Sequence, residues 1–325
     1  MCGQMIWKGE SMKDFRAFDV FKEEGEWYRG NLHSHTINSD GDATPEELVS
    51  WYQRNGYDFL AITDHDVITD VDKLDGKGML LIPGLEFGYD PEEEPTYTLD
   101  MLGINIRELP AFLDPDRTGH VKNDPKISPQ QIIDHLNVIG GMAIMCHPYF
   151  MINMTEPYLK YQGYVGMEAY NYVCEEQCGR GHHEIYWDTM LMRGKRIMGF
   201  ATDDSHKPEF GHAWIEVKAK EKTVPAILEA IREGRFYATA GIQIFDLEYT
   251  DDKVRITFDR PCDVVFMPGC REGWIVRSYQ NEYTLVDGRR RFSAEATVNK
   301  DLPYLRIELI DANGLKAYTN PVYFK

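Results

Sequence analysis

Short apolar runs alternate with capped helical segments between residues 27 and 200, and this alternation most limits the fold that the chain can adopt. TPEE at 44–47 begins one helix, because threonine caps, proline suits the first turn and the second glutamate completes a capping box. SPQQ at 128–131 begins another in the same way. Strands that alternate with helices predict parallel β/α units. We expect strands at 59–62, 79–82, 142–146, 165–169 and 197–201, and further helices at 183–193 and 224–233.

The pattern changes after residue 237 to short alternating runs that turn pairs such as Asp287-Gly288 separate. This change predicts an antiparallel β-sandwich of about seven strands. We therefore predict an α/β chain of two domains, with residues 1–238 in the first and 239–325 in the second. The expected sandwich strands lie at 242–249, 254–258, 264–267, 274–279, 292–298, 305–310 and 318–323.

Charge and composition exclude several classes of protein. The net charge is −18, and the segment from residue 240 onward carries 12 basic and 13 acidic residues, so the acid excess belongs to the first domain. Binding to long nucleic acids needs a basic surface, so this negative charge argues against such a partner. No apolar run approaches the roughly 20 residues of a membrane span and no secretion signal is visible, so we expect no membrane partner and a cytoplasmic protein. The cysteine pair at 174 and 178 lacks the second pair that a zinc knuckle needs.

The motif NLHSH at 31–35 is the sharpest functional signal. Residues two apart on a strand face the same side, so His33 and His35 can offer both imidazoles to one ion. Imidazole suits zinc, iron and manganese, and Asp40 on the following loop adds an oxygen. Taken alone, the motif also fits two strand histidines that face solvent.

Other metal-ligand types follow further apolar runs. His65, Glu86 and His147 each follow a predicted strand, and Asp204 and His206 follow the last of them. The carboxyl ends of barrel strands meet at one rim, where catalytic groups gather. The sequence therefore predicts a metal centre built from five strand ends.

These motifs resemble the PHP (polymerase and histidinol phosphatase) superfamily of metal-dependent phosphoesterases, in the family's order over most of the first 210 residues. The resemblance implies a distorted (β/α)7 barrel that holds two or three divalent ions (Zn, Mn, Fe or Mg). It implies that His33, His35, Glu86 and Asp204 hold one ion, that Glu86 bridges to a second ion at His147, and that Asp40, His65 and His206 hold a third. The matching stretches are HSH at 33–35, SDG at 39–41, TDH at 63–65, Glu86, HP at 147–148 and DSH at 204–206.

One position departs from the family pattern. Where many members have a histidine, this chain has Asp100, which would be the other ligand of the second ion. A carboxylate at that position favours harder ions such as Mn²⁺ or Mg²⁺. A narrower resemblance, over the runs at 193–206, 211–214 and 234–237, is to the carbaryl-hydrolase-like subgroup of PHP enzymes, which implies carboxylic-ester or carbamate cleavage as an alternative.

The expected reaction is attack of a metal-bridging hydroxide on the phosphorus of a small anionic substrate, a phosphate ester. His182, His183, Lys207 and His212 are the candidates for holding the remaining phosphate oxygens. We expect the aspartates at 64, 66 and 203 to orient the ligands rather than bind metal.

Two further segments and two other classes complete the prediction. The polar loop at 109–126, with Arg117, His120 and Lys122, either covers the site or is a solvated loop, and His135 is expected on the surface. A serine hydrolase is excluded because no Gly-x-Ser-x-Gly elbow is present. A catalytically weak binding protein remains open, although the nearly complete ligand set argues against it.

Overall fold

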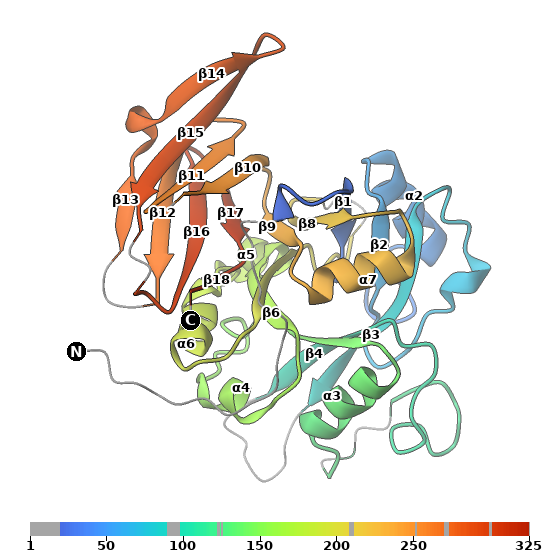
Figure 1. The fold of residues 1–325 in the computed structure, drawn as a ribbon. Helices are drawn as coiled ribbons and strands as arrows, with labels where there is room; N and C mark the ends of the chain where they lie inside the picture. The colour runs from blue at the N-terminus through green and yellow to red at the C-terminus, as the bar shows by residue number, and fades with distance from the viewer. Residues whose placement is uncertain are drawn as a thin grey trace.

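The computed structural model describes residues 20–89, 98–121, 124, 126–207, 211–250, 252–269, 273–298 and 301–324. An α/β part comes first and a strand-rich part follows (Figure 1). The strands of the first part are β1 (Glu26–Asn31), β2 (Phe59–Ile62), β3 (Leu80–Tyr89), β4 (Leu99–Ile104), β5 (Met142–Met145), β6 (Gly166–Asn171), β7 (Met198–Thr202), β8 (Trp214–Ala219) and β9 (Phe236–Thr239). Its helices are α2 (Pro45–Arg54), α3 (Pro129–Val138), α4 (Glu156–Lys160), α5 (Tyr172–Cys178), α6 (Glu184–Met192) and α7 (Val224–Arg232), with a 3-10 turn η1 (Val71–Lys73).

The strands of the first part lie side by side in the order β9-β8-β1-β2-β3-β4-β5-β6-β7. Four neighbouring pairs are parallel, as predicted, but β4 is antiparallel to both β3 and β5. Only residues 90–98 separate β3 from β4, fewer than the dozen or so that a parallel crossover needs. A parallel bridge between Ser34 and Ser205 brings the chain after β1 beside the chain after β7. The strict β/α repeat is therefore broken at β4, while the two ends of the strand run still meet.

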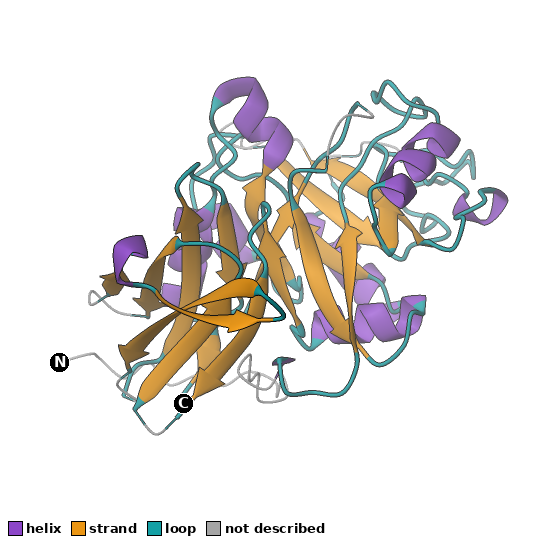
Figure 2. Cartoon of the chain, turned by 90° about the horizontal axis from the view of Figure 1, so that it is seen from above, coloured by secondary structure: helices purple, strands orange, loops and turns teal. Residues whose placement is uncertain are grey.

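Local sequence explains the two helix starts that the capping motifs predict. The Thr44 side chain caps α2 by accepting from the Glu47 backbone, and the Glu47 side chain accepts from the Thr44 backbone. At α3 the side chain of Gln131 accepts from the Ser128 backbone at 2.8 Å. Figure 2 shows most of the helices lying outside the strands. Within the described ranges, no helix has the length and apolar character needed to cross a membrane.

The strand-rich part forms two layers over a shared apolar core. One sheet has the order β10-β11-β15-β14, and the other has the order β13-β12-β16-β17 and continues through β9 into the first part. The prediction missed β14, because all five of its side chains are exposed or partly exposed and show no apolar face. The strands are β10 (Ile244–Tyr249), β11 (Lys253–Phe258), β12 (Cys262–Pro268), β13 (Trp274–Val276), β14 (Glu282–Val286), β15 (Arg289–Thr297), β16 (Tyr304–Asp311), β17 (Lys316–Thr319) and β18 (Val322–Tyr323), with a 3-10 turn η2 (Ser278–Gln280).

Charged side chains join α6 to the strand-rich part. Arg306 donates to both carboxylate oxygens of Asp188, at 2.6 and 2.7 Å, and contacts Glu308 at 3.3 Å. Lys316 lies 2.7 Å from Glu184 and 3.0 Å from Glu308. We call this set the interface network; it consists of Glu184, Asp188, Arg306, Glu308, Lys316 and Tyr318, whose hydroxyl also donates to Glu184.

Candidate metal centre

The predicted ligand residues lie where strands end. His33 and His35 follow β1, His65 follows β2, and Glu86 lies late in β3. Asp40 lies on the loop between β1 and α2, and Asp100 lies on β4. His147 follows β5, and Asp204 and His206 follow β7.

Four of these residues form a deep group, which consists of His33, His35, Glu86 and Asp204 and is almost fully buried. His33 Nε2 lies 3.1 Å from Glu86 Oε2 and 3.2 Å from Asp204 Oδ1. His35 Nε2 lies 3.3 and 3.1 Å from the same two oxygens. Two imidazole nitrogens and two carboxylate oxygens therefore face one common point.

A second, outer group consists of His35, Asp40, His65 and His206. Asp40 Oδ2 lies 3.4 Å from His206 Nε2 and 3.7 Å from His65 Nε2. The Asp40 and His65 side chains are 54% and 38% exposed, whereas the His35 side chain is 0% exposed. The outer group thus forms the solvent-facing side of the cluster, from which a small molecule would approach.

A third group, the Cys146 group, consists of His33, Glu86, Cys146 and His147. His147 Nε2 lies 3.1 Å from Glu86 Oε1, the oxygen that the deep group leaves free. Asp100 belongs to none of the candidate groups among the described residues, although it lies within electrostatic reach of Glu86 and His147. The Cys146 group shares His33 and Glu86 with the deep group, and the outer group shares His35 with it, so the three form one continuous cluster.

The donor set and its spacing fit divalent ions. Donor atoms bound at about 2.0–2.1 Å in a tetrahedron lie roughly 3.3 Å apart, close to the spacing in the deep group. Among the described residues, His35 Nε2, Asp204 Oδ1 and His147 Nδ1 are buried without a hydrogen-bond partner. Buried polar atoms normally have partners, so the approach of His35 Nε2 to Asp204 Oδ1, at 3.1 Å, indicates a bound cation.

The electrostatics of the cluster point the same way. Burial lowers the pKa of the His35 imidazole, but the nearby carboxylates of Asp204 and Glu86 outweigh burial and raise that pKa to about 9. The pKa of His147 rises to about 10, because Glu86 outweighs burial there too. Burial raises the pKa of Asp204, but the imidazoles of His33 and His35 lower it far below its ordinary value. The carboxylates thus favour positive charge at this point.

Glu168 on β6 supports the ligands and was missed by the sequence analysis. It is 0% exposed, and its carboxylate lies 2.7 Å from His33 Nδ1. It also accepts from the His147 backbone and from the Thr202 and Asn171 side chains. A proton held on His33 Nδ1 leaves Nε2 free to bind metal. The available signal was a single glutamate within the apolar run at 165–169.

Two of the predicted orienting aspartates anchor the loops of the site. Asp64 accepts from Thr36, Ser39 and Thr69, which fixes the turn that carries Asp40. Asp203 accepts from the backbone at 212 and 213 and from a buried tyrosine hydroxyl. Asp66 is partly buried, and burial raises the pKa of its carboxyl. Asp64 and Asp203 hold backbone in place instead of facing the cluster donors.

Comparison with known proteins relates this cluster to one family. Residues 31–189 match the PHP domain. The match includes the ligand residues from His33 to His147, while Asp204 and His206 lie beyond its end. No curated protein matches the chain.

Solved structures resemble this chain at low sequence identity. A two-domain protein from Bacteroides vulgatus that contains a predicted PHP-like metal-dependent phosphoesterase is 14% identical, with a TM-score of 0.50 over 95% of both chains. This likeness extends through the strand-rich part as well as the PHP domain. An amidohydrolase from Chromobacterium violaceum with bound sulfate and no metal is 15% identical, with a TM-score of 0.41 over 64% of this chain and 96% of its own. A putative metal-dependent phosphoesterase from Bifidobacterium adolescentis is 15% identical, with a TM-score of 0.39 over 63% of this chain and 96% of its own.

The four predicted substrate-holding residues lie in different surroundings. Lys207 and His212 are exposed, and the His212 ring stacks on Tyr172 with centroids 4.2 Å apart. His182 is partly exposed and lies 3.1 Å from Glu184 of the interface network. His183 is buried at the start of α6, and its Nδ1 accepts from the Tyr149 backbone at 3.3 Å. Burial lowers the pKa of His183 to about 3, so its ring is neutral.

The polar loop after β4 is attached to the chain beside the outer group. The backbone of His120 pairs with that of Val67, and the Val121 backbone donates to the Asp66 carbonyl at 2.8 Å. Arg117 is exposed with a φ of 54°, and Lys122 lies outside the described residues. The loop is therefore anchored next to the His65 strand end. His135 on α3 is partly exposed, near the surface as predicted.

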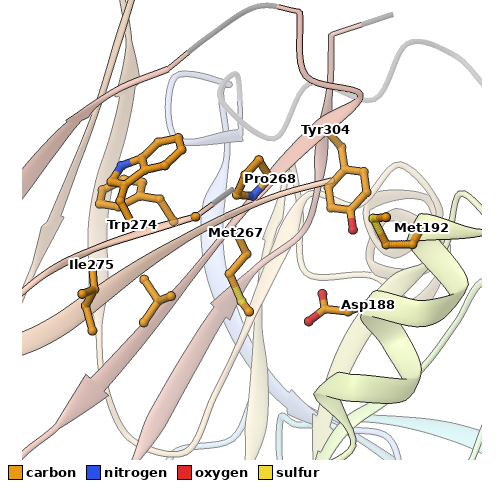
Figure 3. Close-up of a pocket in the computed structure, with 10 residues that line it drawn as sticks. Asp188, Met192, Met267, Pro268, Trp274, Ile275 and Tyr304 are labelled. Carbon is orange, nitrogen blue, oxygen red and sulfur yellow. The ribbon is translucent and has the colours of Figure 1, made fainter. Parts of the chain in front are cut away.

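A cavity of about 560 Å³ lies away from the cluster, between α6 and the strand-rich part (Figure 3). Its lining is mainly apolar, and Asp188 of the interface network supplies a carboxylate. None of the predicted ligands lines it, so it is separate from the candidate metal centre. The lining residues are Asp188, Met192, Val265, Phe266, Met267, Pro268, Gly273, Trp274, Ile275 and Tyr304.

Proposed function

We propose that this protein is a metal-dependent hydrolase that cleaves a small phosphate ester with two or three divalent ions. The observation that carries the proposal is the convergence of donor atoms from separate strand ends on points where buried atoms lack hydrogen-bond partners. A binding module has no need of such a cluster. The match of residues 31–189 to the PHP domain supports the same conclusion.

The ligand assignment follows the three groups. The deep group would hold one ion, and Glu86, with its second oxygen, would connect it to another at His147. Asp40, His65 and His206 would hold the third on the solvent-facing side. When bound, clustered divalent ions lower the pKa of water and neutralise charge on the oxygens of the group that is attacked.

The chain's own residues prepare this centre. Glu168 keeps a proton on His33 Nδ1, and the Asp204 carbonyl accepts from His206 Nδ1 at 2.8 Å, so both rings present Nε2 to the cluster. Burial of the deep group excludes bulk water and strengthens its electrostatics.

A phosphate ester would enter over the outer group. Lys207 directly follows His206 and is exposed, so its ammonium group is placed to attract an anion. His212 is exposed on the loop that Asp203 anchors. We keep Lys207 and His212 as the phosphate-holding residues, because His183 is buried and His182 is engaged with Glu184.

The test is metal analysis of the purified protein, followed by assays on a phosphate monoester, a phosphate diester and a naphthyl carboxylic ester. We expect bound divalent metal and turnover of a phosphate ester that a chelator abolishes and added metal restores. Turnover of the carboxylic ester alone would overturn the substrate class and favour the carbaryl-hydrolase-like alternative. Protein that binds no divalent metal would overturn the metal centre itself. The matched control is Asp263→Ala on the strand-rich part, which should keep full activity.

A further inference from the structure

Cys146 lies beside the second proposed ion, on the interior face of the strands. It follows β5, and its backbone donates to the Asp100 carbonyl at 3.0 Å, which extends the pairing of Met101 with Met145 by one residue. Residues opposite each other on paired strands point to the same face. Gly88 is opposite Asp100 in turn, and Glu86 is two residues from Gly88, so Cys146 shares the face of Glu86.

The side chain of Cys146 is positioned as a ligand, whereas that of Asp100 is not. Cys146 is 0% exposed, and its sulfur lies within 4.8 Å of donor atoms of His33, Glu86 and His147. A Cβ added to Gly88 would lie 3.5 Å from Asp100 Oδ1, so the Asp100 carboxylate leans over that glycine.

Other contacts of the group leave the sulfur available. Cys146 Sγ lies 3.9 Å from the Ile144 carbonyl, a long contact for a weak donor. His147 is 4% exposed and has its Nε2 3.1 Å from Glu86 Oε1, while its Nδ1 has no hydrogen-bond partner within the described chain. The buried His147 Nε2 and Glu86 Oε1 are thus a second pair of donor atoms at this position, independent of the cysteine.

We infer that Cys146 supplies a sulfur ligand to the second ion, together with His147 Nε2 and Glu86 Oε1. The inference rests on the proposed metal centre and deepens it. Cys146 would take the place that the sequence analysis gave to Asp100. Thiolate is a soft ligand that binds zinc or ferrous iron far better than Mg²⁺ or Mn²⁺, so the second position would select a softer ion than a carboxylate there would.

Binding through sulfur has a defined proton balance. The S–H bond breaks, the proton passes to solvent, and the sulfur lone pair forms the bond to the ion. No oxidant or reductant takes part, and the oxidation state of the sulfur is unchanged. Asp100 remains a nearby carboxyl. Its burial and, to a smaller extent, the charge of Glu86 raise its pKa to about 7.

The test uses metal-free protein loaded with Co²⁺ and its absorption spectrum. We expect a near-ultraviolet sulfur-to-cobalt charge-transfer band in the wild-type protein. Cys146→Ser should remove that band and one bound cobalt per chain while keeping the visible cobalt bands of the other sites. Loss of a residue that only hydrogen-bonds a metal ligand costs roughly 10- to 100-fold in metal affinity. Loss of a direct ligand should cost at least that much.

Controls separate this inference from the proposed function. Cys262→Ser changes a buried thiol of the strand-rich part and should keep the band, and so should Asp100→Asn. Cobalt that binds without a charge-transfer band would overturn the sulfur ligand and leave the metal centre standing. A wild-type protein that binds no cobalt would overturn the metal centre. Loss of one bound cobalt in Asp100→Asn but not in Cys146→Ser would return the position to the carboxylate.

Discussion

The candidate metal centre and the interface network both bury acidic side chains, but only the network balances them with lysine and arginine. Arg306 and Lys316 meet the carboxylates of Glu184, Asp188 and Glu308 at 2.6–3.3 Å. In the metal centre, Glu86 and Asp204 face imidazoles, and Asp204 Oδ1 has no hydrogen-bond partner among the described residues. A network that neutralises itself stabilises an interface, whereas a set of donors without cations is prepared to receive them.

The largest expected effect comes from removing a carboxylate of the deep group. Asp204→Ala should abolish turnover and weaken metal binding by more than roughly 100-fold. This exceeds the cost of losing a residue that only hydrogen-bonds a metal ligand. The difference in unfolding temperature between the protein with and without metal should shrink, because the variant binds less metal. Metal analysis and thermal unfolding with and without chelator check this. Unchanged metal content would remove the distinction between the two regions.

The opposite result is expected in the interface network. Arg306→Met should lower the free energy of unfolding by about 3 kcal/mol, because it leaves Asp188 without its cation and Glu308 with Lys316 alone. Metal content per folded chain should stay the same, since no predicted ligand contacts Arg306. Urea unfolding measures the loss. The control is Arg277→Met, which breaks an exposed pair with Asp263 and should cost no more than about 1 kcal/mol.

A smaller effect is expected for Glu168, which acts through His33. Glu168→Gln keeps the size of the side chain but removes the charge that holds the proton on His33 Nδ1. Metal affinity should fall by roughly 10- to 100-fold, as is typical when a residue that hydrogen-bonds a metal ligand is lost. Competition with a chromogenic chelator measures the affinity. Glu295→Gln, at an exposed pair with Lys253, should bind metal as the wild type does, and equal affinity in the two variants would deny Glu168 a positioning role.

The smallest effect concerns His183 and acid stability. Its pKa in the folded protein is about 3, because burial disfavours the charged ring, whereas the unfolded chain has the ordinary value of about 6.5. Between these values the unfolded chain binds more protons, so the contribution of His183 to stability is present above pH 6.5 and is lost as the pH falls toward 3. The slope should reach about 1.4 kcal/mol per pH unit.

Comparison of variants isolates that slope from other titrating groups. His183→Gln should lose less stability than the wild type between pH 6.5 and pH 4.5, as measured by urea unfolding. His135→Gln on α3 should follow the wild type. Parallel acid profiles for wild type and His183→Gln would contradict a neutral, buried ring.

The sequence predicted what local signals determine. The capping motifs gave the starts of α2 and α3, and apolar runs located β2 and β5 within one residue. The α/β character and the strand-rich second part follow from the change in periodicity near residue 237. The ligand residues could be proposed because each follows an apolar run, and the structure brings them together.

What the sequence missed depends on contacts between distant residues. Glu168 is 135 residues from His33, and its neighbours in sequence are apolar, so no local pattern marks it. Whether Cys146 or Asp100 has its side chain beside Glu86 Oε1 and His147 Nε2 depends on the register of β4 and β5, which no motif encodes. The antiparallel pairing of β4 escaped for the same reason, since it follows from a connection too short for a helix.

The position of β9 has a practical consequence. It hydrogen-bonds β8 on one side and β17 on the other, so it crosses the predicted boundary between residues 238 and 239. A protein truncated there would leave the outer backbone groups of β9 open to water and to other copies, which is a template for aggregation. Expression and variant studies should therefore keep both halves in a single polypeptide, since cutting at the change in periodicity would divide a continuous hydrogen-bonded ladder.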